Sequence, residues 1–389
     1  MSSKNIKIKN FLIKKKKITN KKKLLNLFKD LVNSDSQILS SMDKSYKDSY
    51  TKKLVSNLKN IKNINLIGMG GSSLGAKAIY NFLKPKKKFN FIDNFSNISF
   101  KNNNSKNINL IISKSGNTLE TISNLNVLNN KSMKNIFITE NKKSYLMSLA
   151  NKLKAEVIHH NNFIGGRYSV LSEVGMLPAE LMGFKPEKFR KLNQLLKNKK
   201  YINLLIQGVA NILTLNKYNI TNSIILNYDD KSNELFSWYQ QLVAESLGKK
   251  NKGILPIISV MPRDNHSLMQ YYLEGRKNNF FTLFFVKEKK SKKIKNGEIL
   301  SSHSYLRNKT LNEILYSQYL ATENVFKKKK IPFRSFVIDE KNEETLGELF
   351  TFFILETILL GKSLGVDPYN QPAVELIKID TKKKLIKGQ

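Results

Sequence analysis

The chain has 389 residues, and 67 Lys and Arg against 30 Asp and Glu give it a formal net charge of +37. One hydrophobic core stops growing at about 250–300 residues, so 40% apolar and 10% aromatic content predicts two packed domains and excludes a mainly disordered polycation. The absence of Cys excludes disulfides, thiolate catalysis and Cys-ligated zinc, and four His leave little for any other metal site.

Short apolar runs alternate with helical stretches along the first half of the chain, which is typical of βαβ units in a doubly wound α/β sheet. A Lys-rich N-terminal arm is expected at 1–39, helical at 23–32. The first domain is expected at 40–190. Its predicted strands are 64–68, 89–93, 108–113 and 135–140.

The second half repeats this alternation, which predicts a second α/β domain at 191–389. A break near 186–200 marks the boundary, and the Lys-rich segment 287–300 is expected to be a loop. The predicted strands are 222–228, 279–286 and 334–339, and the predicted helices are 201–213, 235–248 and 348–361.

No apolar run approaches the roughly 20 residues needed to cross a bilayer, because even the stretch at 349–361 contains Glu356. The N-terminal segment has neither the apolar core of a secretory signal nor the Arg of a transit peptide. We therefore expect a cytoplasmic protein with no membrane partner.

The excess of positive charge would attract any polyanion, including nucleic acid. Only six of the 67 basic residues are Arg, however, whereas proteins that read base edges favour the bidentate Arg fork. The Lys lie in scattered runs, mostly at expected turns, at 14–17, 21–23, 86–88, 327–330 and 382–384. We interpret them as solvated surface, which argues against a nucleic-acid partner and favours acidic substrates. A polyanion-binding protein stays an alternative.

A glycine-rich segment, GMGGSSLG at 68–75, follows the first predicted strand and opens a helix. Glycines at such a turn let backbone N–H groups approach an anion at a helix N-terminus. Gly68 and Gly70 also match the first two glycines of a dinucleotide-binding fingerprint, with Asp93 as the ribose-binding acid, but Ser73 stands at the third glycine position. A dinucleotide site and a turn that only packs helix on strand are the alternatives.

The segment SKSGNTLET at 113–121 is a stronger signal, because it follows a strand and opens a helix. Ser113, Ser115 and Thr118 place three hydroxyl groups around Gly116 and the first free N–H groups of the helix, which suits a phosphate. The segment lacks the Lys spacing of a Walker motif, so it fits a sugar phosphate better than a nucleoside triphosphate. An ordinary helix cap with loop serines is the alternative.

Two charged residues, Arg167 and Glu245, lie in sequence contexts that predict a fixed side-chain position. Arg167 follows two glycines in GGRYSVLSEVGMLPAEL and precedes a helical run, which indicates a positioned cation or, alternatively, an Arg that braces the loop. Glu245 shares a helical face with Trp238 and Gln241 and is expected to be partly buried at a helix end. A carboxylate there suits a general base, and an exposed helical Glu is the alternative.

Two further residues are less specific by themselves. His266 lies in MPRDNHSLMQYYLEG, just before an apolar helical pattern, with Asp264 near enough to orient its imidazole. A structural His is the alternative. Lys378 lies in DPYNQPAVELIK, where a Pro-punctuated loop leads into a helix that also carries Glu375. In isolation this pattern favours a surface Lys.

Together these segments resemble the glucose-6-phosphate isomerase (phosphoglucose isomerase) family. The similarity extends from about residue 60 to residue 378 and follows the family's order. Its motifs are GMGGSSLG, SKSGNTLET, GGRYSVLSEVG, AESLGK, DNHS and YNQPAVELIK. The resemblance implies two sugar-isomerase (SIS-like) αβα domains with mainly parallel sheets, a homodimer, no cofactor, and interconversion of glucose 6-phosphate and fructose 6-phosphate in glycolysis and gluconeogenesis.

The resemblance also implies roles for single residues. Glu245 would move a proton between C1 and C2, and Arg167 would stabilise the enediolate. His266, supplied by the neighbouring subunit, would open the sugar ring together with Lys378. The expected substrate-binding residues are Gly71 and Ser72 at the sugar, Ser113, Lys114 (through its backbone), Ser115 and Thr118 at the phosphate, and Gln371 at the hydroxyls.

Two positions depart from the usual family pattern, because Ala373 stands where Gly is usual and Asn265 where Gln is usual. Ala adopts positive φ less freely than Gly, so the loop that presents Gln371 is expected to differ. The chain is also shorter than most members, which puts the family's arm-like dimer extensions in question.

Two alternatives stay close to the isomerase hypothesis. A non-catalytic sugar-phosphate sensor of the same fold would keep the Ser/Thr segment but would not need Glu245, Arg167 and Lys378 together. A broader isomerase would also accept mannose 6-phosphate, since C2 epimers differ only at the reacting carbon.

Overall fold

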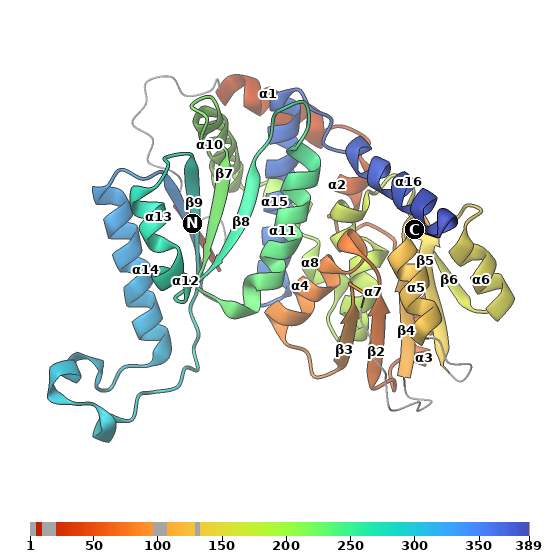
Figure 1. Ribbon diagram of the computed structural model, residues 1–389, viewed down its shortest axis with the longest axis horizontal. Helices are drawn as coiled ribbons and strands as arrows, with labels where there is room; N and C mark the ends of the chain where they lie inside the picture. Colours follow the sequence, from red (N-terminus) through yellow and green to blue (C-terminus); the bar gives the residue numbers. More distant parts are fainter. Residues whose placement is uncertain (1–4, 10–20, 96–106, 129–132, 389) are drawn as a thin grey trace.

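The computed structural model describes residues 5–9, 21–95, 107–128 and 133–388, and it contains two α/β domains that lie side by side (Figure 1). Each domain has a five-stranded sheet. Helices α11 (Asn233–Leu247) and α15 (Glu343–Leu364) lie between the two sheets. The Lys run at 14–17 lies outside the described residues.

The first sheet has the strand order β3-β2-β4-β5-β6, with every described pair parallel. Its strands are β2 (Asn63–Ile67), β3 (Lys88–Ile92), β4 (Asn107–Ile112), β5 (Lys134–Glu140) and β6 (Glu156–His160). The chain moves from β2 to β3 on one side and then returns to β4 on the other. In sheets of this order, ligands bind beyond the carboxyl ends of the strands at the point where the order reverses. That point lies between β2 and β4.

Polar residues inside these strands are paired with one another. Asn65 donates its side-chain amide to Asn109 at 3.0 Å, and Asn109 donates to Asn135 at 2.9 Å. Asn90 donates to Asn65 at 2.9 Å. A buried amide is tolerated when its hydrogen bonds are made, so this ladder explains how Asn occurs in otherwise apolar strands.

The second sheet has the order β1-β10-β9-β7-β8, in which β1 is antiparallel and the other strands are parallel. Its strands are β1 (Ile6–Lys9), β7 (Asn222–Asn227), β8 (Leu255–Val260), β9 (Asn279–Val286) and β10 (Phe333–Ile338). All residues of β9 and β10 are buried, as expected of parallel strands covered on both faces. The predicted N-terminal arm thus contributes a strand to the second sheet, which the sequence analysis did not anticipate, and helix α1 (Lys21–Val32).

Helices surround both sheets. Those of the first half are α2 (Gln37–Ser41), α3 (Lys52–Asn57), α4 (Leu74–Leu83), α5 (Leu119–Leu128), α6 (Tyr145–Leu153), α7 (Glu173–Leu181), α8 (Pro186–Phe189) and α9 (Leu192–Leu196). Those of the second half, besides α11 and α15, are α10 (Lys199–Asn216), α12 (Asp264–Ser267), α13 (Met269–Glu274), α14 (Leu311–Lys328) and α16 (Pro372–Lys387). The predicted loop at 287–300 contains a short 3₁₀ turn at Asn296–Glu298 and one residue, Lys293, in an isolated β-bridge with Thr310.

Helix α15 is buried from Thr345 to Gly361. Its rings contact those of α11, with Trp238 4.8 Å from Phe350 between ring centroids. Glu356, in the apolar middle of the helix, forms a buried ion pair with Arg334 of β10 at 2.5 Å. A buried charge needs such a partner, so the pairing explains how a carboxylate is tolerated within the apolar sequence of this helix. Among the described residues, no helix is long and apolar enough to cross a membrane.

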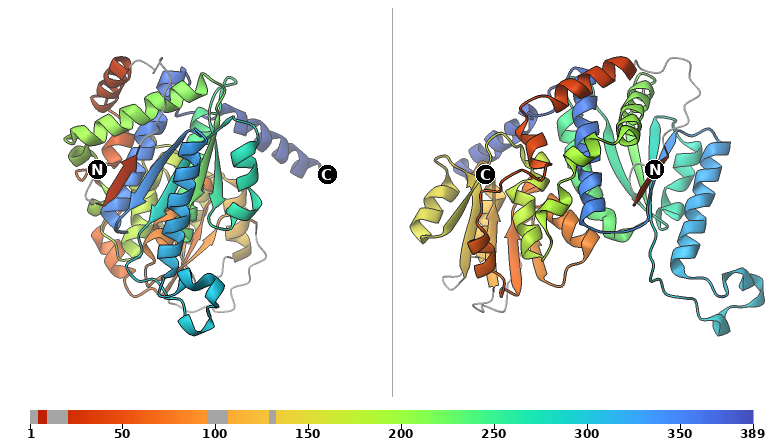
Figure 2. Two further views of the ribbon diagram at one scale, coloured as in Figure 1. Left: turned by 90° about the vertical axis from the view of Figure 1, so that its left-hand side faces the viewer. Right: turned by 180° about the vertical axis from the view of Figure 1, so that it is seen from behind.

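Helix α16 differs from the others because none of its described residues is buried. Figure 2 shows it projecting from the body of the molecule. It leaves the second domain after α15 and runs across the first domain in the view of Figure 1. The segment that joins it to α15 nevertheless contacts the centre of the candidate site.

Candidate active site

The glycine-rich turn after β2 brings three backbone segments close together. A Cβ on Gly68 would lie 2.9 Å from the carbonyl oxygen of Ile112, at the end of β4, and a Cβ on Gly71 would overlap with the carbonyl carbon of Gly166. Gly70 has a φ of +53° and faces the side chain of Gln241 on α11. The turn is therefore glycine-rich because β4, the 165–167 loop and α11 all approach it.

The predicted phosphate segment lies directly beside this turn, at the carboxyl end of β4. Ser113 and Thr118 share a hydrogen bond of 2.8 Å between their hydroxyl oxygens. Ser115 is exposed, and its hydroxyl accepts from the N–H of Asn117 at 3.2 Å. Gly116 has a φ of +65°, which favours glycine there. Helix α5 follows at Leu119, so its N-terminal N–H groups add to the three hydroxyls.

Lys114 connects this segment to the loop that carries Arg167. Its Nζ donates to the carbonyl oxygen of Asn162 at 2.9 Å and lies 3.4 Å from a carboxylate oxygen of Glu140. The Lys114 ammonium is thus held at the side of the site, which leaves its backbone to the role that the sequence analysis expected.

Arg167 is the structural centre of the site. It is 2% exposed and donates five hydrogen bonds of 2.7–3.1 Å. Its acceptors are the hydroxyl of Ser246, the carboxylate of Glu245, the amide oxygen of Gln371 and the carbonyl oxygens of Pro368 and Asn370. One guanidinium thereby joins the 165–167 loop, the end of α11 and the segment before α16. The Arg167 side chain therefore braces backbone carbonyls and also places a cation beside Glu245.

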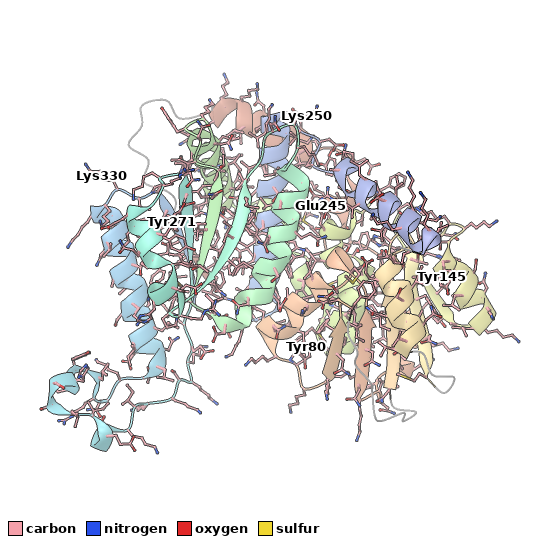
Figure 3. The ribbon with its side chains drawn as sticks, in the orientation of Figure 1. Tyr80, Tyr145, Glu245, Lys250, Tyr271 and Lys330 are labelled. Atoms are coloured by element: carbon pink, nitrogen blue, oxygen red, sulfur yellow. The ribbon has the colours of Figure 1, made fainter. Side chains whose placement is uncertain are left out.

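Glu245 lies near the C-terminal end of α11, where Figure 3 labels it between the two domains. Its Oε1 accepts from Arg167 at 2.8 Å, and its Oε2 accepts from Gln241 Nε2 at 3.0 Å. The side chain is 23% exposed, so the carboxylate is held at both oxygens yet open on one side. A carboxylate fixed in this way can exchange a proton with a molecule that lies beside it.

Gln241 has a second feature that the sequence alone did not single out. Its Oε1 is buried and has no hydrogen-bond partner among the described residues, and it lies beside Gly70. A buried acceptor without a donor is unfavourable. A bound hydroxyl group would satisfy it.

Two aromatic residues, Tyr168 and Trp238, support Arg167 and its hydrogen-bond partners. Neither was predicted from the sequence to belong to the site. The hydroxyl of Tyr168 lies 2.9 Å from that of Ser246 and donates to the carbonyl oxygen of Pro368 at 2.9 Å. Trp238 Nε1 donates to the carbonyl oxygen of Arg167 at 3.2 Å. Tyr168 and Pro368 are 200 residues apart in the chain, so no local pattern could have paired them.

A buried His–Glu pair supports the same loop and was also missed. His160, at the end of β6, has its Nδ1 2.5 Å from Glu173 and its Nε2 2.9 Å from the carbonyl oxygen of Ile164. Glu173 also accepts from the N–H of Asn161 at 3.0 Å and from the hydroxyl of Tyr46 at 3.0 Å. Burial alone would raise the pKa of Glu173, but the hydrogen bond and charge of His160 and the Asn161 N–H lower it below its usual value. This hydrogen-bonded pair holds the chain immediately before Arg167.

His266 is exposed and lies in α12, directly after β8. Strand β8 packs along α11 and starts near its C-terminal half, because Gln240 donates to the carbonyl oxygen of Pro256. Its other end therefore lies near the start of α11, about 18 Å of helix rise from Glu245. The structure does not bring His266 to Glu245 within one chain.

Asp264, expected to orient the His266 imidazole, does something else. Its carboxylate accepts from the N–H of Val260 at 2.8 Å and from the side chains of Ser259, Ser267 and Arg263. These donors lower the pKa of Asp264 against the opposing effect of burial. The expectation was wrong because the carboxylate turns inward and accepts hydrogen bonds from the end of β8 and from the Ser267 side chain.

The residues of the last motif divide into two groups. Gln371 accepts a hydrogen bond from Arg167 at 2.8 Å, so it lies at the candidate site. Lys378 lies on the exposed helix α16, where its Nζ pairs with Glu375 at 2.7 Å. Ala373 is in the first turn of α16 and does not have positive φ, so the departure from Gly causes no backbone strain there.

The alternative of a dinucleotide site gains no support. The carboxylate of Asp93, offered as a ribose ligand, is paired with Lys77 at 2.9 Å. The described residues contain no group of three or more His, Asp or Glu side chains that could hold a metal ion.

Comparison with known proteins fits this geometry. The phosphoglucose isomerase family profile matches residues 21–253. A glucose-6-phosphate isomerase of Methanocaldococcus jannaschii is 31% identical over 377 residues, which cover 92% of each chain. The chain belongs to the phosphoglucose isomerase family. A further member, the glucose-6-phosphate isomerase of Mycoplasmopsis pulmonis, is 33% identical over 358 residues that cover 83% of this chain and 82% of the relative.

Solved structures agree on the fold of this phosphoglucose isomerase family member. A hypothetical protein from Thermus thermophilus superposes with a TM-score of 0.81 at 24% identity and covers 94% of each chain. A glucose-6-phosphate isomerase from Chlamydia trachomatis superposes with a TM-score of 0.75 at 17% identity, covering 95% of this chain and 85% of that one. The predicted SIS-like α/β architecture is confirmed.

Proposed function

We propose that the chain interconverts glucose 6-phosphate and fructose 6-phosphate, with Glu245 moving the proton and Arg167 stabilising the charge that develops. The observation that carries this proposal is the contact between the two residues. Glu245 is fixed by Arg167 and Gln241 across the glycine-rich turn from the phosphate segment, and this turn lies at the reversal point where ligands bind in sheets of this order. Membership of the phosphoglucose isomerase family supports the same reaction.

The phosphate would be bound by Ser113, Ser115, Thr118, the Lys114 backbone and the start of α5. These groups lie at the end of β4, whereas Glu245 approaches from α11 across the glycine turn. Binding the unreactive phosphate holds the reacting carbons in a fixed position, which contributes to catalysis by orientation. Gly71 and Ser72 belong to the same glycine-rich turn, in which Gly71 packs against the backbone of Gly166 and Arg167, and they would line the sugar.

The proton transfer uses no group outside the chain. The Glu245 carboxylate removes the proton from C2 of the open-chain aldose, and the electron pair moves to the carbonyl oxygen to give a cis-enediolate. Returning the proton to C1, together with transfer of the O2 hydroxyl proton to O1, gives the ketose. Arg167 lies 2.8 Å from Glu245, so its guanidinium would face the negative oxygens, and such stabilisation is strong in a site shielded from water.

Ring opening needs an acid and a base before any carbon-bound proton can be removed. Within one chain His266 is remote from Glu245, so the site would be completed by His266 of the partner subunit in a homodimer. Lys378 would take part after α16 moves, because it is now exposed and paired with Glu375. Gln371 and the unpaired Oε1 of Gln241 would hold substrate hydroxyls.

The decisive experiment is a coupled assay. Purified protein is supplied with fructose 6-phosphate, and glucose 6-phosphate is detected by its dehydrogenase. Turnover that disappears in Glu245→Gln supports the proposal. Binding of the sugar phosphate without turnover would instead favour the sensor alternative, and equal turnover of mannose 6-phosphate would favour the broader isomerase.

A mixing experiment tests the shared site. Glu245→Gln and His266→Ala homodimers should each be nearly inactive. Refolding a 1:1 mixture gives about half heterodimers, and in each heterodimer one site carries both changes while the other carries neither. Activity should recover to about a quarter of the wild type. No recovery, with heterodimers confirmed by mass, would place both residues in the same subunit's site or His266 outside the mechanism.

The cellular setting follows from the proposed reaction. The enzyme would work in the cytoplasm, in glycolysis and gluconeogenesis, with a hexose 6-phosphate as its partner and no cofactor, membrane or nucleic acid. The proposed domains are an arm at 1–39, a first SIS-like domain at 40–190 and a second at 191–389. Salt titration of binding to generic DNA separates this proposal from a polyanion-binding role.

A further inference from the structure

A cavity lies in the second domain, and its lining does not include the residues around Glu245. Its volume is about 540 Å³, which is in the range of small-molecule sites. The cavity is bounded by the first residues of β9 and β10, the ends of α10 and α14, and α13. Its mouth therefore lies at the amino ends of the parallel strands, whereas the candidate active site lies at the carboxyl ends of the first sheet. In Figure 3, Lys330 marks this side of the molecule.

The inner wall of the cavity is aromatic and closely packed. Phe281 of β9 lies 5.2 Å from Tyr272 and 4.7 Å from Phe326 between ring centroids, and Phe326 lies 5.9 Å from Phe333. All four rings are buried or nearly so. Edge-to-face packing at these separations is favourable, so the wall is preformed and does not depend on a ligand.

The mouth of the cavity is basic. Its lining includes Arg276, Lys277, Lys327, Lys329 and Lys330, and none of the described lining residues is acidic. Two carboxylates lie nearby, because Lys327 is 3.7 Å from Glu323 and Lys329 is 3.8 Å from Glu274. Five cationic side chains thus line the apolar cavity, and only two of them are paired with a nearby carboxylate among the described residues.

A structural role explains part of this charge. Cations near the ends of α13 and α14 complement the negative C-terminal ends of these helices. That role does not require an open apolar chamber between the same side chains. A preformed apolar body beneath an excess of positive charge is complementary to a ligand that has an apolar body and one negative end.

We propose that this cavity binds a small amphipathic anion, with an aromatic ring or acyl chain against Phe281 and Phe326 and one carboxylate, sulfonate or phosphate among the lysines. A hexose phosphate does not fit this description, because its hydroxyls would lose hydrogen bonds to water against aromatic walls. The site is thus distinct in chemistry from the phosphate segment at 113–118.

The proposal is tested with 8-anilinonaphthalene-1-sulfonate as the probe on the full-length protein. Its fluorescence should rise to saturation with one site per chain, weaken with added salt, and fall when dodecanoate competes. Glucose 6-phosphate, present at saturating concentration, should not displace the probe. Displacement by glucose 6-phosphate would place the probe in the active site and overturn the proposal.

Matched variants locate the binding site. Arg276→Glu combined with Lys330→Glu replaces two attractions by two repulsions, which should weaken probe binding about fivefold or more. Lys59→Glu combined with Lys152→Glu makes the same change of net charge at exposed positions of the first domain and should leave binding unchanged. Equal weakening in both pairs would show only general attraction to a polycation and would overturn the proposal.

A third variant tests the chamber itself. Ile331→Trp places a larger side chain at the cavity wall and should abolish saturable binding while isomerase activity persists. Unchanged binding in a folded Ile331→Trp protein would contradict the proposal. Where this variant does not fold, the two charge pairs decide, because their side chains are exposed.

Discussion

Replacing Arg167 by Lys tests whether the guanidinium, and not only its charge, organises the site. Arg167 donates to five acceptors at 2.7–3.1 Å. A Lys ammonium has a single nitrogen with three donors and cannot reproduce the planar fork. At least two acceptors therefore lose their donor. Pro368 keeps one, because Tyr168 also donates to its carbonyl oxygen.

We expect Arg167→Lys to lower both the catalytic rate and the folding stability. Loss of an oriented donor at a developing oxyanion lowers kcat by about 10²–10³. A buried acceptor left without a donor costs about 1–3 kcal/mol of folding free energy. The Michaelis constant should change little, since the residues proposed to bind the phosphate do not contact Arg167 directly. Coupled kinetics and denaturant titration measure the two effects separately.

Arg190→Lys is the matched control. Arg190 is also buried, at 3% exposed, and donates to the carbonyl oxygen of Leu171 at 2.9 and 3.0 Å and to Asp48 at 2.6 Å. It lies outside the candidate site, so this variant should lose stability but keep most of its kcat. If both variants lost kcat equally, or if Arg167→Lys turned over at nearly the wild-type rate, the role given to Arg167 would be refuted.

Three further predictions concern the base, metals and the supporting pair. Glu245→Gln should lower kcat by about 10²–10⁴ with unchanged affinity for glucitol 6-phosphate, and a wild-type kcat would mean that another group is the base. Activity should survive exhaustive EDTA treatment, because the described residues hold no metal-ligating cluster, and a loss restored by a divalent ion would contradict the mechanism. The pKa of Glu173 is lowered in the folded state. Its ionised form therefore stabilises the fold at pH values above the ordinary pKa of 4.5. This contribution is lost as the pH falls through the lower pKa of the folded state. The melting-temperature difference between wild type and Glu173→Gln should therefore be largest at neutral pH and shrink in acid, whereas a constant difference would refute the lowered pKa of Glu173.

The sequence was sufficient for the elements that hydrophobic patterns specify. Each predicted strand was found within one residue of the range in the structure, for example β9 at Asn279–Val286, because parallel strands are continuous apolar runs. Strands β1, β6 and β8 were not predicted. Strand β1 has the sequence IKIK, in which alternating Lys resembles the rest of the basic arm. Its pairing with β10 joins residues more than 300 positions apart.

The site was predictable where a motif carries its own chemistry. Ser113 and Thr118 could be paired from their spacing, since the helix start brings them together. The contacts of Arg167 with Pro368, Asn370 and Gln371 span about 200 residues, so only the fold reveals them. His160 and Glu173 were missed because each looks like an ordinary strand or helix residue until the 161–166 loop brings them together.

The role of Glu245 as the proton carrier is tested most directly by measuring how much solvent deuterium is incorporated into the product. The reaction is run from glucose 6-phosphate in D₂O, and deuterium at C1 of fructose 6-phosphate is measured by NMR. An enediolate formed by a carboxylate base exchanges part of its proton with solvent, so wild-type product should carry deuterium at C1, and Glu245→Gln should lose both labelling and turnover. Turnover without any deuterium at C1, or undiminished labelling in Glu245→Gln, would contradict the role of Glu245 as the proton carrier.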